Sequence, residues 1–117
     1  MTYVDGFVMP VRKDKLEAYR AMARLGSTVW REYGALDYRE YIADDVKPGK
    51  VTSFPQAVKL EPDEIVVFAW ITYHSRAHRD EVNAKVMADP RMKCDENNVP
   101  FDGQRMIFGG FEIMVEA

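Results

Sequence analysis

The sequence has little of three features that would assign it to a specialised class of protein. It has one cysteine, Cys94, so no disulfide can form within the chain, and a free thiol is typical of the reducing cytoplasm. Its longest apolar run, residues 65–71, is far shorter than the roughly 20 residues that span a bilayer. Its 16 Lys and Arg are outnumbered by 19 Asp and Glu, so we expect no nucleic-acid or membrane partner.

The first residues also lack the basic and apolar regions of a secretory signal, which favours a cytoplasmic protein. At Cys94 the functional alternative is a nucleophile or redox sensor. Lys93 would lower the pKa of this thiol and Asp95 would raise it, so an incidental loop thiol is the simpler interpretation. With 47% hydrophobic and 30% charged residues, the 117-residue chain is expected to form a single globular domain over residues 1–117.

The first half of the chain predicts a strand, a helix and a second strand. Residues 3–9 are rich in β-branched and aromatic side chains, and Pro10 should end that strand. Apolar residues then recur at steps of three and four, which predicts an amphipathic helix of about twenty residues. Asp14 should cap this helix in a capping box, and Gly34 should end it. Residues 36–46 alternate in polarity and predict the second strand.

The second half predicts a strand, a helix and a final strand. Residues 64–73 form the strongest strand pattern, after an irregular insert in which Ser53 can open a helical turn. Ser75 should cap a helix that runs to about residue 89. Residues 104–115 predict the last strand, in which Gly109-Gly110 suggests a bulge or a close approach. The order β-α-β-β-α-β predicts an α+β, ferredoxin-like chain with an antiparallel sheet covered by helices on one face.

The uncovered face of this sheet should be polar if the chain is a monomer. In the strand of residues 64–73, however, Ile65, Val67 and Ile71 alternate with Phe68 and Trp70, so both faces are apolar. Residues 104–115 show a similar pattern. Monomers rarely expose a patch of this kind, so we expect a homodimer that buries the face against a second copy.

Five blocks of the sequence resemble the YbaA-like family of small bacterial proteins, a family of unknown function in the dimeric α/β-barrel superfamily. They are YVDGF (3–7), ADDVKPGK (43–50), TSFP (52–55), SRAHRD (75–80) and PFDGQRM (100–106). The resemblance implies a ferredoxin-like protomer whose sheet joins that of a partner to close a dimeric α/β barrel. It implies no reaction, although the wider superfamily includes cofactor-independent monooxygenases, isomerases and haem-degrading enzymes.

Two carboxylates, Asp5 and Glu40, interrupt otherwise apolar strand patterns and are the candidate catalytic residues. A carboxyl group in an apolar pocket has a raised pKa and can act as a general acid or base near neutral pH. The alternative is ion pairing at strand ends, for example with Arg39 or Arg105, and Glu112 is open to the same two interpretations. The side chains expected to line a pocket beside these carboxylates are Trp30, Tyr38, Trp70, His78 and Phe108.

Metal and cofactor sites are not expected. His74 and His78 have a spacing that can chelate a metal when both lie on one helix face. His74, however, precedes the expected cap Ser75, so the simpler interpretation is that each histidine makes local hydrogen bonds near the start of the helix. Trp70 followed by His78 is similar to the strand tryptophan and helix histidine of haem-degrading barrels, but with a different spacing. Gly109-Gly110 lacks the strand-to-helix context of a phosphate loop.

Two functions follow as hypotheses. The first is a homodimer that binds a small aromatic or enolic molecule without catalysis, or is purely structural with a filled core. The second is a cofactor-independent monooxygenase or isomerase that acts on such a molecule through Asp5 or Glu40. A filled interior with both carboxylates in salt bridges would favour a structural protein, whereas a pocket of several hundred Å³ that holds a carboxylate would favour the enzyme.

Overall fold

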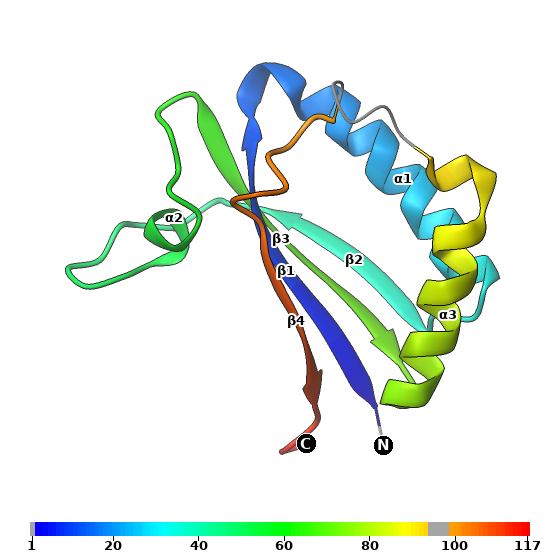
Figure 1. Ribbon diagram of the computed structural model, residues 1–117. Coiled ribbons are helices and arrows are strands. Elements are labelled where there is room, and N and C mark those ends of the chain that lie inside the picture. The colour runs from blue at the N-terminus through cyan, green and yellow to red at the C-terminus, as the bar shows by residue number, and fades with distance from the viewer. Residues whose placement is uncertain (1, 94–98) are drawn as a thin grey trace.

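The computed structural model describes residues 2–93 and 99–117, which fold as an α+β structure with a four-stranded antiparallel sheet (Figure 1). The strands lie in the order β2-β3-β1-β4. Their bounds are β1 Tyr3–Arg12, β2 Asp37–Ile42, β3 Glu64–Tyr73 and β4 Ile107–Glu112. The helices are α1 Leu16–Glu32, the short α2 Phe54–Ala57 and α3 Arg76–Ala88, with 3-10 turns at Lys13–Lys15 and Pro90–Met92. None of the helices described is long and apolar enough to cross a membrane.

The first strand runs through Pro10, and the prediction that this proline ends it is wrong. Pro10 lies opposite Val66, whose carbonyl accepts a hydrogen bond from Ala43 on the β2 side. Because bonding directions alternate along an antiparallel pair, Val66 and Pro10 do not bond each other and the nitrogen of Pro10 faces away from β3. The paired register with β4 ends at Val8–Ile107, so no ladder bond is lost there.

The two outer strands are shorter than expected. In β2, the Ala43 N–H makes the last hydrogen bond to β3. The chain then leaves the sheet at Asp44 and Asp45, whose side chains are exposed. In β4, pairing begins at Ile107 because residues 102–105 form a turn closed by the Arg105 N–H on the Asp102 carbonyl. The pairing of Gly109 and Gly110 is one-for-one, so there is no bulge.

The helices begin and end partly as expected. Ser75 caps α3, since its hydroxyl accepts from the His78 N–H at 3.1 Å, and Ser53 caps α2 in the same way. Gly34 follows α1 with a φ of +112°, a conformation that favours glycine. The capping box at Asp14 is wrong: α1 begins after a 3-10 turn without a side-chain cap, and Asp14 instead pairs with Arg12 at 2.8 Å.

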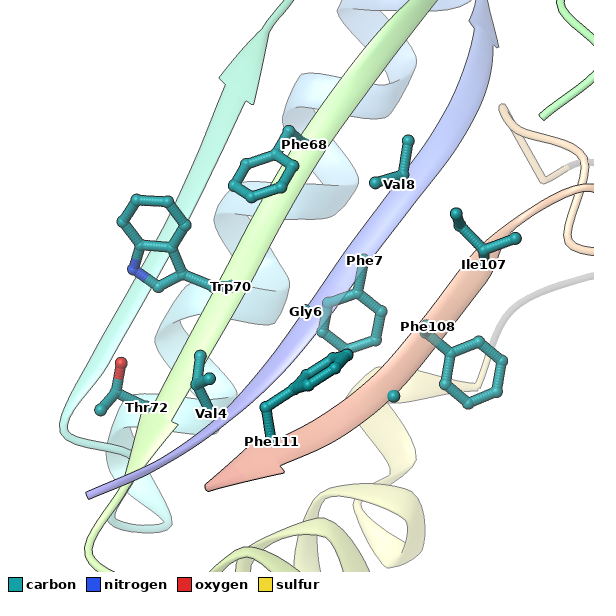
Figure 2. Close-up of a pocket in the computed structure, with 11 residues that line it drawn as sticks. Val4, Gly6, Phe7, Val8, Phe68, Trp70, Thr72, Ile107, Phe108 and Phe111 are labelled. Carbon is teal, nitrogen blue, oxygen red and sulfur yellow. The ribbon is translucent and has the colours of Figure 1, made fainter. Parts of the chain in front are cut away.

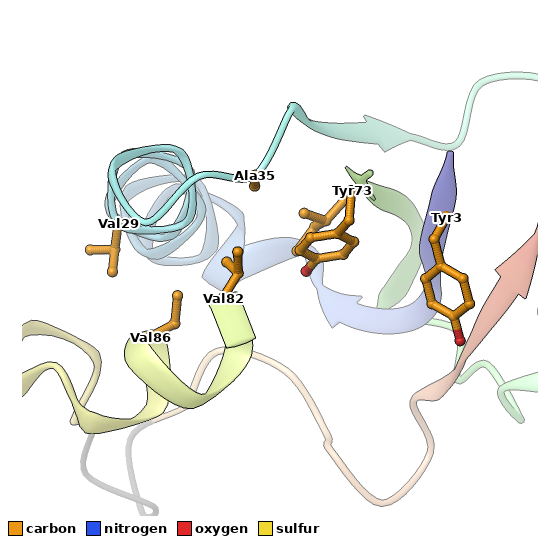
Figure 3. Close-up of a cluster of buried hydrophobic side chains, with 7 residues drawn as sticks. Tyr3, Val29, Ala35, Tyr73, Val82 and Val86 are labelled. Atoms are coloured by element: carbon orange, nitrogen blue, oxygen red, sulfur yellow. The ribbon is translucent and has the colours of Figure 1, made fainter. Parts of the chain in front are cut away.

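Both long helices pack on one face of the sheet, where Figure 1 shows α1 and α3 side by side. Figure 3 shows the cluster that joins them to the strands: Val29 of α1 and Val82 and Val86 of α3 lie near Tyr73 of β3 and Tyr3 of β1. A second cluster holds the other end of α1, through Tyr19, against β1 and β3. The amphipathic stripe predicted for the first helix therefore faces the sheet.

The opposite face is covered only at one end. The insert that contains α2 folds over it, and Val58 packs there against Val8 and Val66. This corrects the expectation that the face has no cover at all. The remainder of the face is open and still apolar, with Phe68 and Trp70 at its centre.

Candidate functional site

A cavity of about 850 Å³ lies between the covered face of the sheet and α1, closed at one end by residues 99–106. Its wall is largely apolar and is rich in two residue types. Five methionines line it, namely Met9, Met22, Met87, Met92 and Met106. Five aromatic residues line it as well: Phe7, Tyr19, Trp30, Tyr38 and Phe101. Methionine side chains adapt to irregular shapes, so a methionine-rich wall can fit around a bound molecule. A tightly packed core would leave no room for one.

Glu40 and Asp102 are the carboxylates among the described residues of this wall, and two phenols hold Glu40. The Tyr38 hydroxyl donates to one carboxylate oxygen at 2.6 Å, and the Tyr19 hydroxyl donates to the other oxygen. Tyr19 comes from α1, whereas Tyr38 and Glu40 lie two residues apart on β2 and therefore share a face. The three side chains form one polar site, which we call the Glu40 cluster, in an otherwise apolar cavity.

Electrostatics keep both phenols protonated. Burial raises the pKa of Tyr19 and of Tyr38, and the negative charge of Glu40 raises each further, because a phenolate beside a carboxylate is disfavoured. Both hydroxyls therefore act as donors toward Glu40. Their oxygens keep lone pairs that can accept a hydrogen bond from a bound molecule.

Trp30 forms the wall beside this cluster. Its ring lies 5.9 Å, centroid to centroid, from that of Tyr38, and its Nε1–H donates to Asn83 on α3 at 3.1 Å. Gly26, one turn earlier on α1, leaves room for the Tyr38 hydroxyl: a methyl group there would lie 3.1 Å from that oxygen. The helix thus presents an aromatic face and a gap to the Glu40 cluster.

Asp5, the other candidate carboxylate, lies outside the cavity wall. It is buried on β1 and forms an ion pair with Arg79 of α3 at 2.6 Å. Burial raises the pKa of Asp5, whereas the Arg79 charge and hydrogen bonds from Asn83 and Tyr73 oppose that rise. The ion pair is the alternative that the sequence left open, with Arg79 as the partner instead of Arg39 or Arg105.

Trp70 belongs to a second concavity, a groove of about 560 Å³ on the open face of the sheet. Phe108 borders this groove from the edge strand β4, but it lies opposite Phe7 and its ring stacks on that of Phe7 at 6.1 Å, so it shares the face of Phe7. Figure 2 shows Phe68 and Trp70 of β3 in front of the strands, with Val4 and Val8 of β1 beside them. Trp70 packs against Tyr41 at 4.9 Å and Phe68 at 5.6 Å between ring centroids. Among the described lining residues of this groove, Thr72 carries a hydroxyl and none is charged. The prediction that one pocket holds all five aromatic and histidine residues is therefore wrong: Trp30 and Tyr38 line the cavity, Trp70 and Phe108 line the groove, and His78 lines neither.

Comparison with known proteins places the chain in a family. The family model described as protein of unknown function DUF1428 matches residues 2–103. The chain belongs to the DUF1428 family. The uncharacterized protein YbaA of Escherichia coli K12 and that of Shigella flexneri are each 53% identical to it over 116 residues, which covers 99% of each chain. The resemblance to YbaA-like proteins is thereby confirmed.

A solved structure shares the fold of this DUF1428 member. An uncharacterized NIPSNAP domain protein from Burkholderia xenovorans superposes with a TM-score of 0.57 and covers 98% of this chain and 97% of its own. The two sequences are 13% identical, so the likeness concerns the arrangement of the α+β fold.

The two histidines of this DUF1428 chain lie near the start of α3 and line neither cavity. The Nδ1 atom of His78 accepts a hydrogen bond from the His74 N–H at 3.0 Å, and the His78 ring meets Tyr73 edge-on. Among residues 2–93 and 99–117, no three His, Cys, Asp or Glu side chains are grouped as metal ligands. Cys94 lies outside the described residues, so its interpretation, like the cytoplasmic location, stays a prediction.

Sequence reasoning missed Tyr19 and Phe101 as residues of the candidate site. Tyr19 was assigned only to the core-facing stripe of the first helix. A signal was nevertheless present, because a buried tyrosine hydroxyl needs a polar partner and a carboxylate on an apolar strand face needs donors. Phe101, whose ring meets that of Tyr19 edge-on at 6.0 Å, lies between the second predicted helix and the last predicted strand, where no periodicity marks a residue as buried.

Proposed function

We propose that this protein binds a small aromatic or enolic molecule in the cavity beside Glu40, as a homodimer of single-domain chains over residues 1–117. The observation that carries the proposal is the Glu40 cluster inside an apolar cavity of about 850 Å³. Ligand sites are typically cavities of roughly 300–1,000 Å³ with apolar walls and a few convergent polar groups. A concavity of this size, with the Glu40 cluster in its wall, favours binding over a purely structural role.

The homodimer forms, in this proposal, through the open face of the sheet. The described residues that line its groove carry no charge, so two identical faces can meet without like-charge repulsion. On this face Ile107 and Phe111 of β4 are 46% and 61% exposed, which leaves apolar area that association can remove from water. The strand order β2-β3-β1-β4 supports a ferredoxin-like protomer, and two such sheets facing each other would form the dimeric α/β barrel that the sequence suggests.

Acid–base catalysis on the bound molecule is the second candidate function, and the position of Glu40 favours it. A carboxylate in a cavity can remove a proton from a phenol or enol, and the Tyr19 and Tyr38 hydroxyls hold that of Glu40 in position. The ion pair of Asp5 with Arg79 makes Asp5 the weaker candidate for that role. Return of the proton to another carbon would give an isomer. With dioxygen as the oxidant, conversion of a CH2 group of the bound molecule to a carbonyl would place one oxygen atom in the product and release the other as water.

Tryptophan fluorescence tests the binding proposal. The chain has two tryptophans, so a Trp70→Phe variant keeps Trp30 of the cavity wall as the sole indole emitter. Native mass spectrometry of freshly purified protein should show a co-purifying small molecule. Its removal and return should change the Trp30 emission of this variant. Protein that carries no such mass, and whose Trp30 emission is unaffected by a panel of phenols and aryl amines, would contradict the proposal.

The same molecule separates binding from catalysis. If Glu40 is a catalytic base, Glu40→Gln should abolish conversion of the molecule even at concentrations that saturate the variant, whereas Asp5→Asn should leave conversion intact. If the protein only binds, the wild type should return the molecule unchanged after prolonged incubation in the presence of dioxygen. Sedimentation at micromolar concentration tests the dimer separately, and a stable species of 117 residues would contradict it.

A further inference from the structure

We propose that the molecule bound in this cavity is an organic ammonium ion with an apolar, aromatic body, and that its cationic nitrogen lies against the Glu40 cluster. This inference rests on the proposed function, since it requires the cavity to be a binding site. It goes further by naming the charge and the hydrogen-bonding character of the ligand. Three properties of the cavity carry it: its charge, the direction of its hydrogen bonds and the nature of its wall.

The charge of the wall is negative. Two acidic side chains, Glu40 and Asp102, line the cavity, and no Lys, Arg or His is among the described lining residues. Asp102 is already neutralised by Arg105, whose Nε lies 2.8 Å from a carboxylate oxygen. Glu40 has phenol partners alone, and within residues 2–93 and 99–117 it forms no ion pair. The two phenols give this carboxylate hydrogen bonds but no positive charge, so a bound cation would compensate the charge that remains.

The hydrogen bonds of the Glu40 cluster also favour a cationic ligand. Both phenolic hydrogens are directed at the carboxylate, so neither hydroxyl has a hydrogen left for a ligand. What the cluster presents to the cavity is a set of oxygen lone pairs on Glu40, Tyr19 and Tyr38. A ligand with N–H groups can satisfy these acceptors. A carboxylate or phosphate would place its own lone pairs and negative charge against them and should be excluded.

Aromatic rings surround the position of the proposed cation. The Trp30 and Tyr38 rings lie 5.9 Å apart beside the cluster, and the Tyr19 ring contacts Phe101 at 6.0 Å between centroids. The faces of tryptophan and tyrosine attract ammonium groups through the ring quadrupole, most strongly where water is displaced. The methionines farther along the wall can adapt to the apolar body of the ligand. A neutral phenol would use the aromatic wall but leave the negative charge uncompensated.

Three probes with the same phenyl body and different polar ends test this inference: 2-phenylethylammonium, 2-phenylethanol and 3-phenylpropionate. Their affinities are measured by calorimetry on the wild-type protein stripped of any co-purifying molecule. We expect the ammonium to bind at least tenfold more tightly than the alcohol, and the carboxylate to bind most weakly. This ranking needs no variant, so it remains decisive even where a substitution at Glu40 impairs folding.

A pair of charge-matched variants then locates the preference. Glu40→Gln should reduce the affinity for the ammonium at least tenfold and leave that for the alcohol nearly unchanged. Glu81→Gln, which removes the same charge from an exposed pair with Lys85 on α3, should change neither affinity by more than about twofold. Thermal unfolding of both variants confirms that each is folded before binding is measured.

The outcomes distinguish this inference from the proposed function. If the alcohol or the carboxylate binds as tightly as the ammonium, or if Glu40→Gln keeps the preference, the cavity is a binding site but the inference is wrong. If none of the probes binds and native mass spectrometry finds no ligand, the proposed function and the inference both fall. If the ammonium binds preferentially and Glu40→Gln removes the preference, both stand.

Discussion

The two faces of the sheet are apolar in different ways. The face under α1 and α3 encloses a cavity in which Glu40, Tyr19 and Tyr38 form a polar cluster within an apolar wall. The open face carries a groove lined by aliphatic and aromatic side chains with Thr72 as its polar member. A cluster of acceptors suits a small ligand with donors, whereas an uncharged groove suits a second copy of itself. Because successive side chains along β2 and β3 point to opposite faces, adjacent residues of one strand face the ligand cavity and the proposed dimer interface in turn.

The largest effect should come from a charge on the open face. Phe68→Glu places a carboxylate at the centre of the groove, and in a homodimer the two copies of that charge would be buried near each other without partners. We expect at least a hundredfold weaker self-association, measured by sedimentation velocity across a concentration series. Leu25→Glu, on the part of α1 outside its core-facing stripe, is the matched control and should leave association unchanged. A Phe68→Glu variant that still sediments as a dimer would contradict the assignment of this face.

The next effect concerns the ion pair that joins the covered face to α3. Arg79→Ala leaves the buried carboxylate of Asp5 without its cation, which should cost roughly 3 kcal/mol of unfolding free energy in urea denaturation. Asp5→Asn in the same background removes the unpaired charge and should restore part of the loss. Glu40→Gln should cost less, about 1 kcal/mol, because one phenol keeps the amide oxygen as acceptor and the other hydroxyl can accept from the amide N–H. Equal losses of unfolding free energy in Arg79→Ala and Glu40→Gln would contradict this difference between the two carboxylates.

The pH dependence of the Arg79→Ala loss follows from the pKa of Asp5. Burial raises this pKa in the folded state, and without Arg79 the main opposing charge is gone. A carboxyl group with a raised folded pKa destabilises the fold when it is charged, and it ceases to do so as the pH falls through that pKa. The loss should therefore be largest near neutral pH and should shrink on acidification. A loss that grows as the pH falls would show that Asp5 is stabilised as an anion by other groups.

A smaller effect is expected where residues 99–106 close the cavity. Arg105 pairs with both carboxylate oxygens of Glu64, at 2.7 and 2.6 Å, and holds the pKa of Glu64 below its usual range. Arg105→Gln should lower the unfolding free energy at pH 7 by about 1–2 kcal/mol and weaken ligand binding through a looser wall. Because a lowered carboxyl pKa stabilises the fold in full only above the unfolded value, the difference from wild type should decline below that value and disappear as the pH falls through the folded pKa of Glu64. A difference that persists in acid would assign the effect to lost packing instead of the ion pair.

The elements that sequence predicted well are those in which pattern and packing agree. The apolar run 65–71 has the length of a central strand, and β3 spans Glu64–Tyr73 as expected because neighbours pair with it on both sides. The ends of β2 and β4 were wrong because those strands lie at the edges, where a turn such as that at Arg105 can replace ladder bonds without a change in residue pattern. The continuation of β1 through Pro10 depends on which of its sides has a partner, and the residues of one strand do not contain that information.

The two candidate carboxylates show the same limit for the site. Asp5 and Glu40 have equivalent signatures, since each interrupts an apolar strand pattern. Their environments differ because Arg79 is 74 residues from Asp5 along the chain, whereas Glu40 meets Tyr19 and Tyr38. A burial pattern predicts that a polar group needs a partner, but the tertiary fold decides whether that partner is a cation or a phenol.

The smallest effect on stability is expected from substitutions at two glycines, Gly26 on α1 and Gly109 on β4. Gly26→Ala should gain up to about 1 kcal/mol in helix propensity, yet the new methyl group would lie 3.1 Å from the Tyr38 hydroxyl and push it from Glu40. We expect a net change in unfolding free energy within about 1 kcal/mol but a severalfold loss of ligand affinity. At Gly109 on β4 the nearest atom, on Phe111, would be 3.7 Å away, so Gly109→Ala should leave ligand affinity unchanged. Calorimetric titration with 2-phenylethylammonium compares the two variants. If both keep wild-type affinity, the Tyr38–Glu40 contact does not contribute to binding, and the recognition assigned to the covered face must come from its apolar wall alone.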